Sequence, residues 1–327
     1  MCSVFGLLDY QGRLTPAERL RIIRTLGNAA EIRGTDATGI AYVQGDGIHI
    51  QKAPRPAHLM HYRISPDARY IMGHTRATTQ GNESFNPNNH PFPGKAGKMP
   101  FALTHNGMLF NDLELRREHR LPRTKIQTDS YVAAQLLEKW GEVSHNSLKR
   151  MAELLRGTFT ITVLDGDNNL YFVRGNNPLT IYLFPERGFY LYASTTEILD
   201  AALLRLGMAG EVRTGIKVSQ GDILQIKGDG KRVLTRFDDA HLSMRSCYYY
   251  GGYYDWYPIA GSGAHKGEKD DYLEEVIRYG GVLGIPETEL RLLAEAGYDA
   301  FDLEELLWDK ELRQWCLDEI TCELEVR

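Results

Sequence analysis

The hydrophobic pattern between residues 15 and 34 predicts an amphipathic helix. Thr15 and Glu18 have the spacing of a capping box, Pro16 stands at the first helical position and Gly34 marks the end. The apolar positions along one side of this helix are Leu20, Ile23, Leu26 and Ala30. One face of the helix is therefore expected to pack on a hydrophobic core.

Two further segments, 128–140 and 146–157, show the same helical pattern, with Thr128 and Asn146 as expected caps and Gly157 as a stop. Short runs rich in β-branched and aromatic residues surround them, several bounded by Gly, Asn and Asp. These expected strands are residues 39–43, 47–52, 70–75, 100–105, 158–165, 169–175, 179–184, 188–194 and 221–226. Many antiparallel strands with few helices predict an α+β layered domain.

Residues 241–267 separate two regions of different charge. The stretch is rich in glycine and aromatic residues without a period, which is typical of a linker. From residue 265 onward the chain holds 18 acidic and 7 basic residues, in patterns typical of helices. We therefore expect a main domain over 2–240, the linker, and an acidic helical region over 268–327. The linker's rings are expected to pack on the main domain, with a partner surface as the alternative.

The composition, with 43% hydrophobic and 25% charged residues, is typical of a globular protein. The net charge of -5 argues against a nucleic-acid partner bound through bulk positive charge. The chain has no run of 18 apolar residues and no leader pattern at its start. We therefore expect a cytoplasmic protein that binds neither nucleic acid nor a membrane.

The cysteines are too few and too irregularly spaced for a disulfide framework or a C-x-x-C zinc site. They are Cys2, Cys247, Cys316 and Cys322. His58 and His61 have helical spacing but no neighbouring cysteine, so they are expected on the surface. The sequence therefore predicts no metal and no cofactor, and Cys316 and Cys322 are expected to be packing residues.

Cys2 has two interpretations. It opens the apolar run of residues 2–8, so it is compatible with a small core residue at the start of a strand. A thiol with a pKa of about 8.5 can also pass its proton to an α-amine with a pKa of about 7.7 to 8.0. This proton transfer would make an amino-terminal cysteine a nucleophile. That second interpretation requires removal of Met1, which a small second residue permits.

Four short stretches place polar residues beside glycine at the ends of expected strands, where binding groups usually gather. They are residues 33–39, 73–81, 104–107 and 128–130. Each one alone is also compatible with a structural turn or a helix cap. Their common position makes them candidates for one site.

Together with Cys2, these stretches resemble the class II glutamine amidotransferase domain. The motifs "MCSVFG", "RGTDATG", "GHTRATTQG", "HNG" and "TDS" occur in that family's order and approximate spacing, over about residues 2 to 235. The resemblance is closest to the glutaminase domains of amino-sugar and purine-pathway amidotransferases. It implies a four-layer αββα N-terminal-nucleophile hydrolase sandwich, here with a small α-helical C-terminal extension.

The resemblance also implies roles for individual residues. Cys2 would attack the carboxamide carbon of L-glutamine, while the Asn106 side chain and the Gly107 N–H would donate to the developing oxyanion. Arg76 would hold the α-carboxylate and Asp129 the α-ammonium. The substrate-binding residues so implied are Arg76, Asp129, Arg33, Thr79 and His105, with Arg33 ordering the amino-terminal end.

This chain departs from the family pattern at four positions. Ala77 and Gln80 lie in a loop that often closes over glutamine in the family, and Ser3 and Tyr131 lie beside the nucleophile and Asp129. None of these departures removes a group that the chemistry requires. The long polar stretch of residues 81–100 predicts a mobile surface loop near the site.

The resemblance implies glutamine hydrolysis through a Cys2 thioester, with ammonia passed to an acceptor. The chain lacks the phosphate-binding motif G-x-x-x-x-G-K-[ST], so the acceptor chemistry is expected on a separate partner protein. Two alternatives stay open. One is an N-terminal-nucleophile hydrolase for another amide, against which Arg76 and Asp129 weigh, and the other is a non-catalytic binding or regulatory protein on the same fold.

Overall fold

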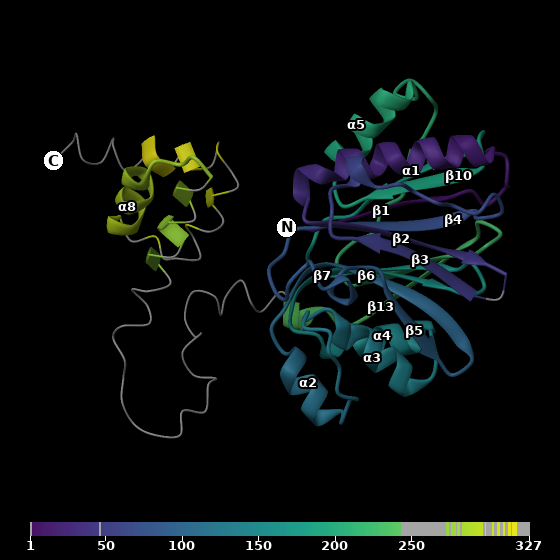
Figure 1. Ribbon diagram of the computed structural model, residues 1–327, viewed down its shortest axis with the longest axis horizontal. Coiled ribbons are helices and arrows are strands. Elements are labelled where there is room, and N and C mark those ends of the chain that lie inside the picture. Colours follow the sequence, from purple (N-terminus) through teal and green to yellow (C-terminus); the bar gives the residue numbers. More distant parts are fainter. Residues whose placement is uncertain are drawn as a thin grey trace. The chain divides into compact units, whose positions relative to one another are not determined.

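The computed structural model describes residues 2–45, 47–242 and a set of residues between 273 and 318 (Figure 1). The chain divides into two compact units, Met1–Tyr253 and Tyr254–Arg327. Most of the expected linker lies outside the described residues, as do Cys247 and Cys322. The boundaries of the linker and of the acidic helical region therefore stay predictions.

A seven-stranded antiparallel sheet forms one half of the first unit, in the order β11-β9-β10-β1-β4-β2-β3. Its strands are β1 (Ser3–Leu8), β2 (Ala37–Gln44), β3 (Gly47–Ala53), β4 (Tyr70–Arg76), β9 (Thr180–Phe184), β10 (Phe189–Ala193) and β11 (Thr214–Gly215). All six residues of β1 are buried, because this strand lies at the centre of the sheet and both of its faces are covered.

A six-stranded antiparallel sheet forms the other half, in the order β13-β12-β8-β7-β6-β5. Its strands are β5 (Phe92–Ala96), β6 (Met99–Leu109), β7 (Gly157–Asp165), β8 (Leu170–Arg174), β12 (Asp222–Ile226) and β13 (Arg232–Arg236). The expected turn between β7 and β8 is confirmed: Asp165 Oδ1 accepts the backbone N–H groups of Asp167 and Asn169, at 3.0 and 2.9 Å.

Figure 1 shows the two sheets face to face, with helices on their outer faces. The helices are α1 (Pro16–Ala30), α2 (Asp112–Glu118), α3 (Tyr131–Trp140), α4 (His145–Leu154) and α5 (Thr196–Leu206). In β1, Phe5 and Leu7 join the core under α1 and α5, whereas Val4 and Leu8 join the core between the sheets. This alternation follows the two-residue period of a strand. The mixture of helices and antiparallel strands confirms the α+β class.

The expected helices exist, although two of their caps were predicted wrongly. In α1 the capping box is confirmed, since Thr15 Oγ1 accepts from Glu18 N at 3.2 Å and Glu18 Oε2 accepts from Thr15 N at 2.8 Å. The α4 helix is capped not by Asn146 but by Ser144, which forms a reciprocal box with Ser147. The α3 helix starts after Ser130, and the Thr128 hydroxyl has no hydrogen-bond partner among the described residues.

The expectation of a surface loop over residues 81–100 is wrong. Part of this segment forms β5, and Asn88, Asn89 and His90 are buried. Asparagine side chains replace the missing regular structure, because Asn88 Nδ2 donates to Asn82 O at 2.9 Å and Asn89 Nδ2 donates to Glu83 O at 2.8 Å. The polar composition that indicated a loop therefore holds the segment together.

The second unit has its own hydrophobic cluster. Within the expected acidic helical region, α8 (Glu287–Glu295) is a helix whose Leu290 and Leu293 are fully buried. The same cluster contains Leu303, Leu306, Leu307, Cys316 and Leu317. Cys316 is therefore a packing residue, as expected.

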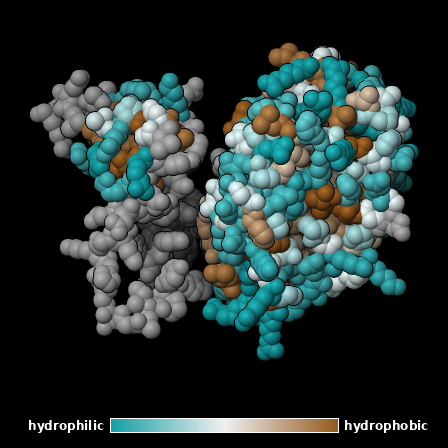
Figure 2. Space-filling view, viewed as in Figure 1, coloured by the Kyte–Doolittle hydropathy of each residue, from teal (hydrophilic) through white to brown (hydrophobic). Residues whose placement is uncertain are grey.

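Apolar side chains are scattered over the surface. The viewed face of the first unit is mostly hydrophilic, with apolar residues in small groups (Figure 2). Ile32, Leu113 and Leu204, the most exposed large apolar side chains among the described residues, belong to three separate elements. Scattered apolar residues of this kind are normal on protein surfaces. No helix in the described part of the chain is long and apolar enough to cross a membrane.

The capping box of α1 generates a stability prediction. The substitution Thr15→Ala removes the oxygen that accepts from Glu18 N, so it should lower the free energy of unfolding by about 1 kcal/mol. Thr25→Ala, in the interior of the same helix, should cost less, because alanine has the higher helix propensity there. Urea denaturation of both variants checks this, and equal losses would contradict it.

Candidate active site

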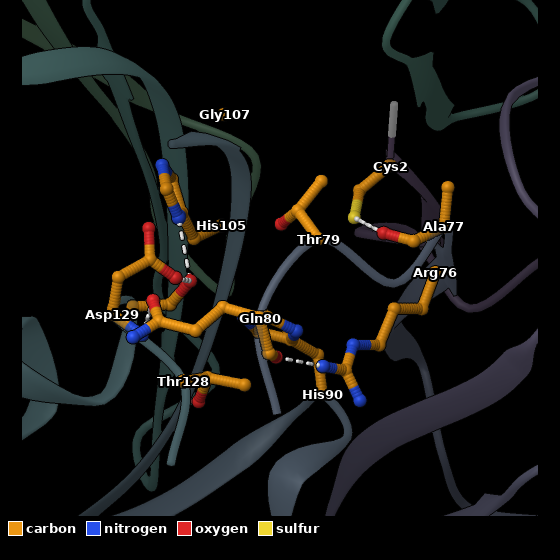
Figure 3. A pocket seen from close by; sticks show the side chains of 11 residues that line it. Cys2, Arg76, Ala77, Thr79, Gln80, His90, His105, Gly107, Thr128 and Asp129 are labelled. Atoms are coloured by element: carbon orange, nitrogen blue, oxygen red, sulfur yellow. Dashed lines mark hydrogen bonds between the residues drawn. The ribbon is translucent and has the colours of Figure 1, made fainter. Parts of the chain in front are cut away.

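Sheet register brings Cys2 and Arg76 together at the ends of two neighbouring central strands of the seven-stranded sheet. Ser3 of β1 pairs with Thr75 of β4, and Cys2 and Arg76 are the next residues beyond that pair. Figure 3 shows both side chains on one side of a pocket, with Thr79 between them and His105 and Asp129. Residues far apart in the sequence therefore meet at one strand end.

This pocket collects most of the predicted site residues. It is lined by Cys2, Arg76, Ala77, Thr79, Gln80, His90, His105, Gly107, Thr128, Asp129 and Ser130. Two predicted residues are not part of the lining. Arg33 lies next to the pocket, where its Nε donates to the backbone carbonyl of the lining residue Cys2 at 3.0 Å. Asn106 lies on β6 between the lining residues His105 and Gly107.

The Cys2 thiol is half-buried and donates a weak hydrogen bond to the Ala77 carbonyl at 3.4 Å. Burial raises the pKa of the thiol, an effect that the nearby positive charge of Arg76 opposes. The thiol is therefore protonated at neutral pH. A base must take that proton before the sulfur can act as a nucleophile.

Arg76 organises the turn that follows it. Its guanidinium donates to Asn89 Oδ1 at 2.7 Å and to the carbonyls of Gln80 and Gly81 at 2.5 and 3.2 Å. These three acceptors use three of the five N–H donors of the side chain. Two donors remain for a ligand, and the carbonyl contacts hold residues 77–81 in place without one.

Gln80 joins this turn to Asp129. Its carbonyl accepts from Arg76, while its side-chain Oε1 accepts from the backbone N–H of Asp129 at 3.1 Å. The two charged groups of the pocket are therefore connected through one residue. Gln80 was noted in the sequence as a departure from the family pattern, and the structure gives it a bridging position.

Asp129 lies at the start of α3, where the helix dipole favours a carboxylate. Its Oδ2 accepts from Leu109 N at 2.6 Å and its Oδ1 accepts from Ser130 Oγ at 3.1 Å. A carboxylate has about four lone-pair positions, so capacity remains for a further donor. Asp129 is therefore a fixed, buried carboxylate in the lining of the pocket.

His105 belongs to the same network. Its Nε2 lies 3.2 Å from the Thr158 carbonyl, which can only accept, so Nε2 carries the proton. The Nδ1 of the neutral ring then accepts from Ser130 Oγ at 2.7 Å. Ser130 has one hydroxyl proton, so it donates either to His105 or to Asp129. Burial lowers the pKa of His105, and the charge of Asp129 opposes that effect.

Asn106 and Gly107 follow His105 on β6. The Asn106 side chain is fully buried, and its Nδ2 donates to Ser194 Oγ at 3.3 Å while its Oδ1 has no partner among the described residues. Gly107 has φ 145, and a Cβ at this position would stand 1.9 Å from the Thr158 carbonyl. The backbone at residue 107 therefore requires glycine.

Three histidines are buried around the base of the pocket. His74 Nε2 donates to the His105 carbonyl at 3.0 Å, and the rings of His74 and His90 lie 4.2 Å apart. Both ring nitrogens of His90 lack partners within the described residues. Burial lowers the pKa of His74 to about 3 and that of His90 well below its usual value. In the described ranges, no three His, Cys, Asp or Glu side chains are placed to hold a metal ion.

Sequence reasoning missed His90, Thr128 and Ser130 as lining residues. His90 was hidden because the segment around it is polar and lacks a periodic pattern. Thr128 and Ser130 lie in the "TDS" motif, where only Asp129 was given a binding role. The position of these residues on either side of a candidate binding residue was the available signal.

In comparisons with known proteins, the model of a family described as a glutamine amidotransferase domain matches residues 76–201. This range includes every predicted site residue except Cys2 and Arg33. Glutamine--fructose-6-phosphate aminotransferase of Bacillus licheniformis is 32% identical over 193 residues, which cover 56% of this chain and 30% of that protein. The similarity thus extends over much of the chain, but the chain spans only about a third of that relative.

A second relative and a solved structure are also similar to this chain. The 7-cyano-7-deazaguanine synthase of Saccharolobus solfataricus is 28% identical over 211 residues, 62% of this chain and 44% of that protein. The glutamine phosphoribosylpyrophosphate amidotransferase of B. subtilis superposes with a TM-score of 0.55 at 21% identity, covering 72% of this chain and 49% of that chain. The last comparison establishes similarity of fold.

The buried histidines generate a pH prediction. A histidine that is neutral when folded and titrates near pH 6.5 when unfolded stabilises the fold above that pH, and the stabilisation is lost as the pH falls towards the folded-state pKa. For His74 the loss should reach about 1.4 kcal/mol per pH unit between about pH 6 and pH 4.

Urea denaturation at several pH values measures this slope. The substitution His74→Gln keeps a donor for the His105 carbonyl but cannot titrate, so its unfolding free energy should fall less steeply with decreasing pH than that of the unsubstituted protein. Identical slopes would show that His74 is not a source of the acid sensitivity.

Proposed function

We propose that the chain contains a class II glutamine amidotransferase domain and that it hydrolyses L-glutamine to glutamate and ammonia through a thioester on Cys2. One observation carries the proposal. A cysteine, a guanidinium and a buried carboxylate line the same pocket, at the point where the strand of the nucleophile begins. These groups match the carboxamide, the α-carboxylate and the α-ammonium of glutamine.

The proton of the thiol passes to the α-amine of the same residue once Met1 has been removed. The amine has a pKa near neutrality and lies two bonds from the carbon that carries the sulfur. The thiolate attacks the carboxamide carbon, and the C–N bond breaks as the amine returns the proton to the leaving nitrogen. Water then attacks the thioester, which releases glutamate and restores the thiol.

The oxyanion of the tetrahedral intermediate is stabilised by Gly107 N–H and the Asn106 side chain. The two ends of an amide group are nearly isosteric, and hydrogen bonds distinguish them. Ser194 Oγ already accepts from Val4 N at 2.9 Å and still has a proton to donate. A 180° rotation of the Asn106 amide group exchanges the positions of Oδ1 and Nδ2. Oδ1 then accepts the Ser194 proton, and Nδ2 takes the position that Oδ1 holds without a partner.

The two ends of the amino acid are held by opposite charges. Arg76 retains two N–H donors for the α-carboxylate, and Asp129 retains lone pairs for the α-ammonium. Thr79, between these groups and Cys2, offers a hydroxyl to the substrate, and His105 lies on the same side of the pocket as Asp129, within hydrogen-bond distance of Ser130. Arg33 orders the amino-terminal end through the Cys2 carbonyl. This arrangement favours an amide that carries an α-carboxylate and an α-ammonium over amides that lack them.

Ammonia is passed to an acceptor on a separate partner protein. Two findings support this part of the proposal. The chain matches 30% of the aminotransferase and 44% of the synthase, so its similarity is confined to part of each relative. The sequence also lacks a phosphate-binding loop for an ATP-dependent acceptor step.

The role of the nucleophile is tested by substitution. Cys2→Ala should lower glutamate release from glutamine by at least about a thousandfold, since the covalent route is lost. Cys316→Ala is the matched control, because this second free cysteine is buried in the other compact unit and should leave turnover unchanged. Equal glutamate release by Cys2→Ala and the unsubstituted protein would refute the proposed nucleophile.

The role of Asp129 is tested with two substrates. Asp129→Asn should raise the KM for glutamine about 10- to 100-fold, since a hydrogen bond to a charged group contributes about 1.5–3 kcal/mol. The same variant should change little in its use of 4-carbamoylbutanoate, which lacks the α-ammonium. Steady-state kinetics on both substrates decide, and equal losses would mean that Asp129 supports the fold rather than the substrate.

A further inference from the structure

The loop between β8 and β9 reaches across to the proposed oxyanion site. Asn177, in this loop, donates from Nδ2 to the carbonyl of Asn106 at 2.8 Å. The bond joins a loop residue to the backbone of β6, although the two residues are 71 positions apart in the sequence. It holds one side of the peptide group whose other side is Gly107 N–H.

Gly107 makes room for this contact. An ideal Cβ at residue 107 would stand 2.8 Å from Asn177 Nδ2 as well as 1.9 Å from the Thr158 carbonyl. Any larger residue would therefore displace the asparagine amide. The glycine of the "HNG" motif and Asn177 of the "RGNNPL" stretch are thus fitted to each other.

Three further hydrogen bonds fix the loop to β7, the strand next to β6. Thr160 Oγ1 donates to the Asn177 carbonyl at 2.7 Å, and Asn177 N donates to the Phe159 carbonyl at 3.4 Å. Phe159 N donates to Asn176 Oδ1 at 3.1 Å. The Asn177 side chain is therefore held by its own backbone and is not free to follow the Asn106 carbonyl.

A trans peptide group is planar, and its C=O and N–H point in opposite directions. Fixing the Asn106 carbonyl therefore also fixes the direction of Gly107 N–H. We propose that Asn177 is a positioning residue that aims the Gly107 N–H at the oxyanion. This inference rests on the proposed function, because the oxyanion forms only when the carboxamide is attacked.

The inference predicts a loss confined to the transition state. Asn177→Asp replaces the donor with an acceptor, so it should lower kcat about 10- to 100-fold while the KM for glutamine stays within about twofold. Asn177→Ala removes the donor without adding charge and should show the same split. Asn176→Asp is the matched control, because it adds the same charge one residue away and keeps the oxygen that accepts from Phe159 N.

An inhibitor gives a second readout. The aldehyde analogue of glutamine adds the Cys2 thiol and forms a tetrahedral oxyanion, whereas the product glutamate does not. Both Asn177 variants should bind the aldehyde more weakly by about the factor lost in kcat, with glutamate affinity unchanged. Thermal unfolding, measured alongside, shows that each variant is folded.

The outcomes separate this inference from the function on which it rests. If the unsubstituted protein releases no glutamate from glutamine, the proposed function fails. If that protein is active and both Asn177 variants keep its kcat, the positioning role is overturned. It is equally overturned if kcat, KM and thermal stability fall together, or if Asn176→Asp loses as much kcat as Asn177→Asp.

Discussion

A half-buried thiol with a raised pKa needs a base, and the rest of the proposed site depends on this constraint. Burial raises the pKa of Cys2, so the reactive thiolate is not present in quantity at neutral pH. Within the described residues, the hydrogen-bond partner of the sulfur is the Ala77 carbonyl, which cannot act as a base. In the proposed mechanism the α-amine of Cys2, exposed by removal of Met1, takes the thiol proton. This explains why a nucleophile would stand at the start of the first strand.

Two sheets cooperate to build the pocket around that sulfur. In the seven-stranded sheet, the pairing of β1 with β4 brings Cys2 and Arg76 together at the strand ends. The six-stranded sheet supplies His105 and Gly107 from β6. The cluster between the sheets contains side chains from both and fixes one against the other. Asp129 adds the negative charge from the start of α3. The site therefore depends on how the two sheets pack. The close packing of the core between them fixes the positions of the sheets relative to each other.

Local patterns predicted many of the elements that this packing joins, although not α2, α5 or β5. The α1 capping box could be read from Thr15 and Glu18, because both of its partners lie within four residues of each other. The nine expected strands correspond to strands in the structure for the same reason, since alternation and turn residues are local signals. The ordered motifs placed six of the eight predicted residues in one pocket.

What the sequence missed depends on contacts between distant residues. The segment before β5 looked like a loop because its asparagines satisfy backbone groups through side chains, a pattern without a period. The bridge from Arg76 to Asp129 through Gln80, and the contact of Asn177 with β6, likewise link separate motifs. Propensity and spacing carry no information about such pairs, so only the folded arrangement shows them.

The most direct test of the account is mass spectrometry of the active protein after reaction with a diazoketone analogue of glutamine. The account predicts an amino-terminal peptide that begins at Cys2, with a free α-amine and the label on its sulfur. Fully active protein that retains Met1, or that carries the label on another residue, would contradict it.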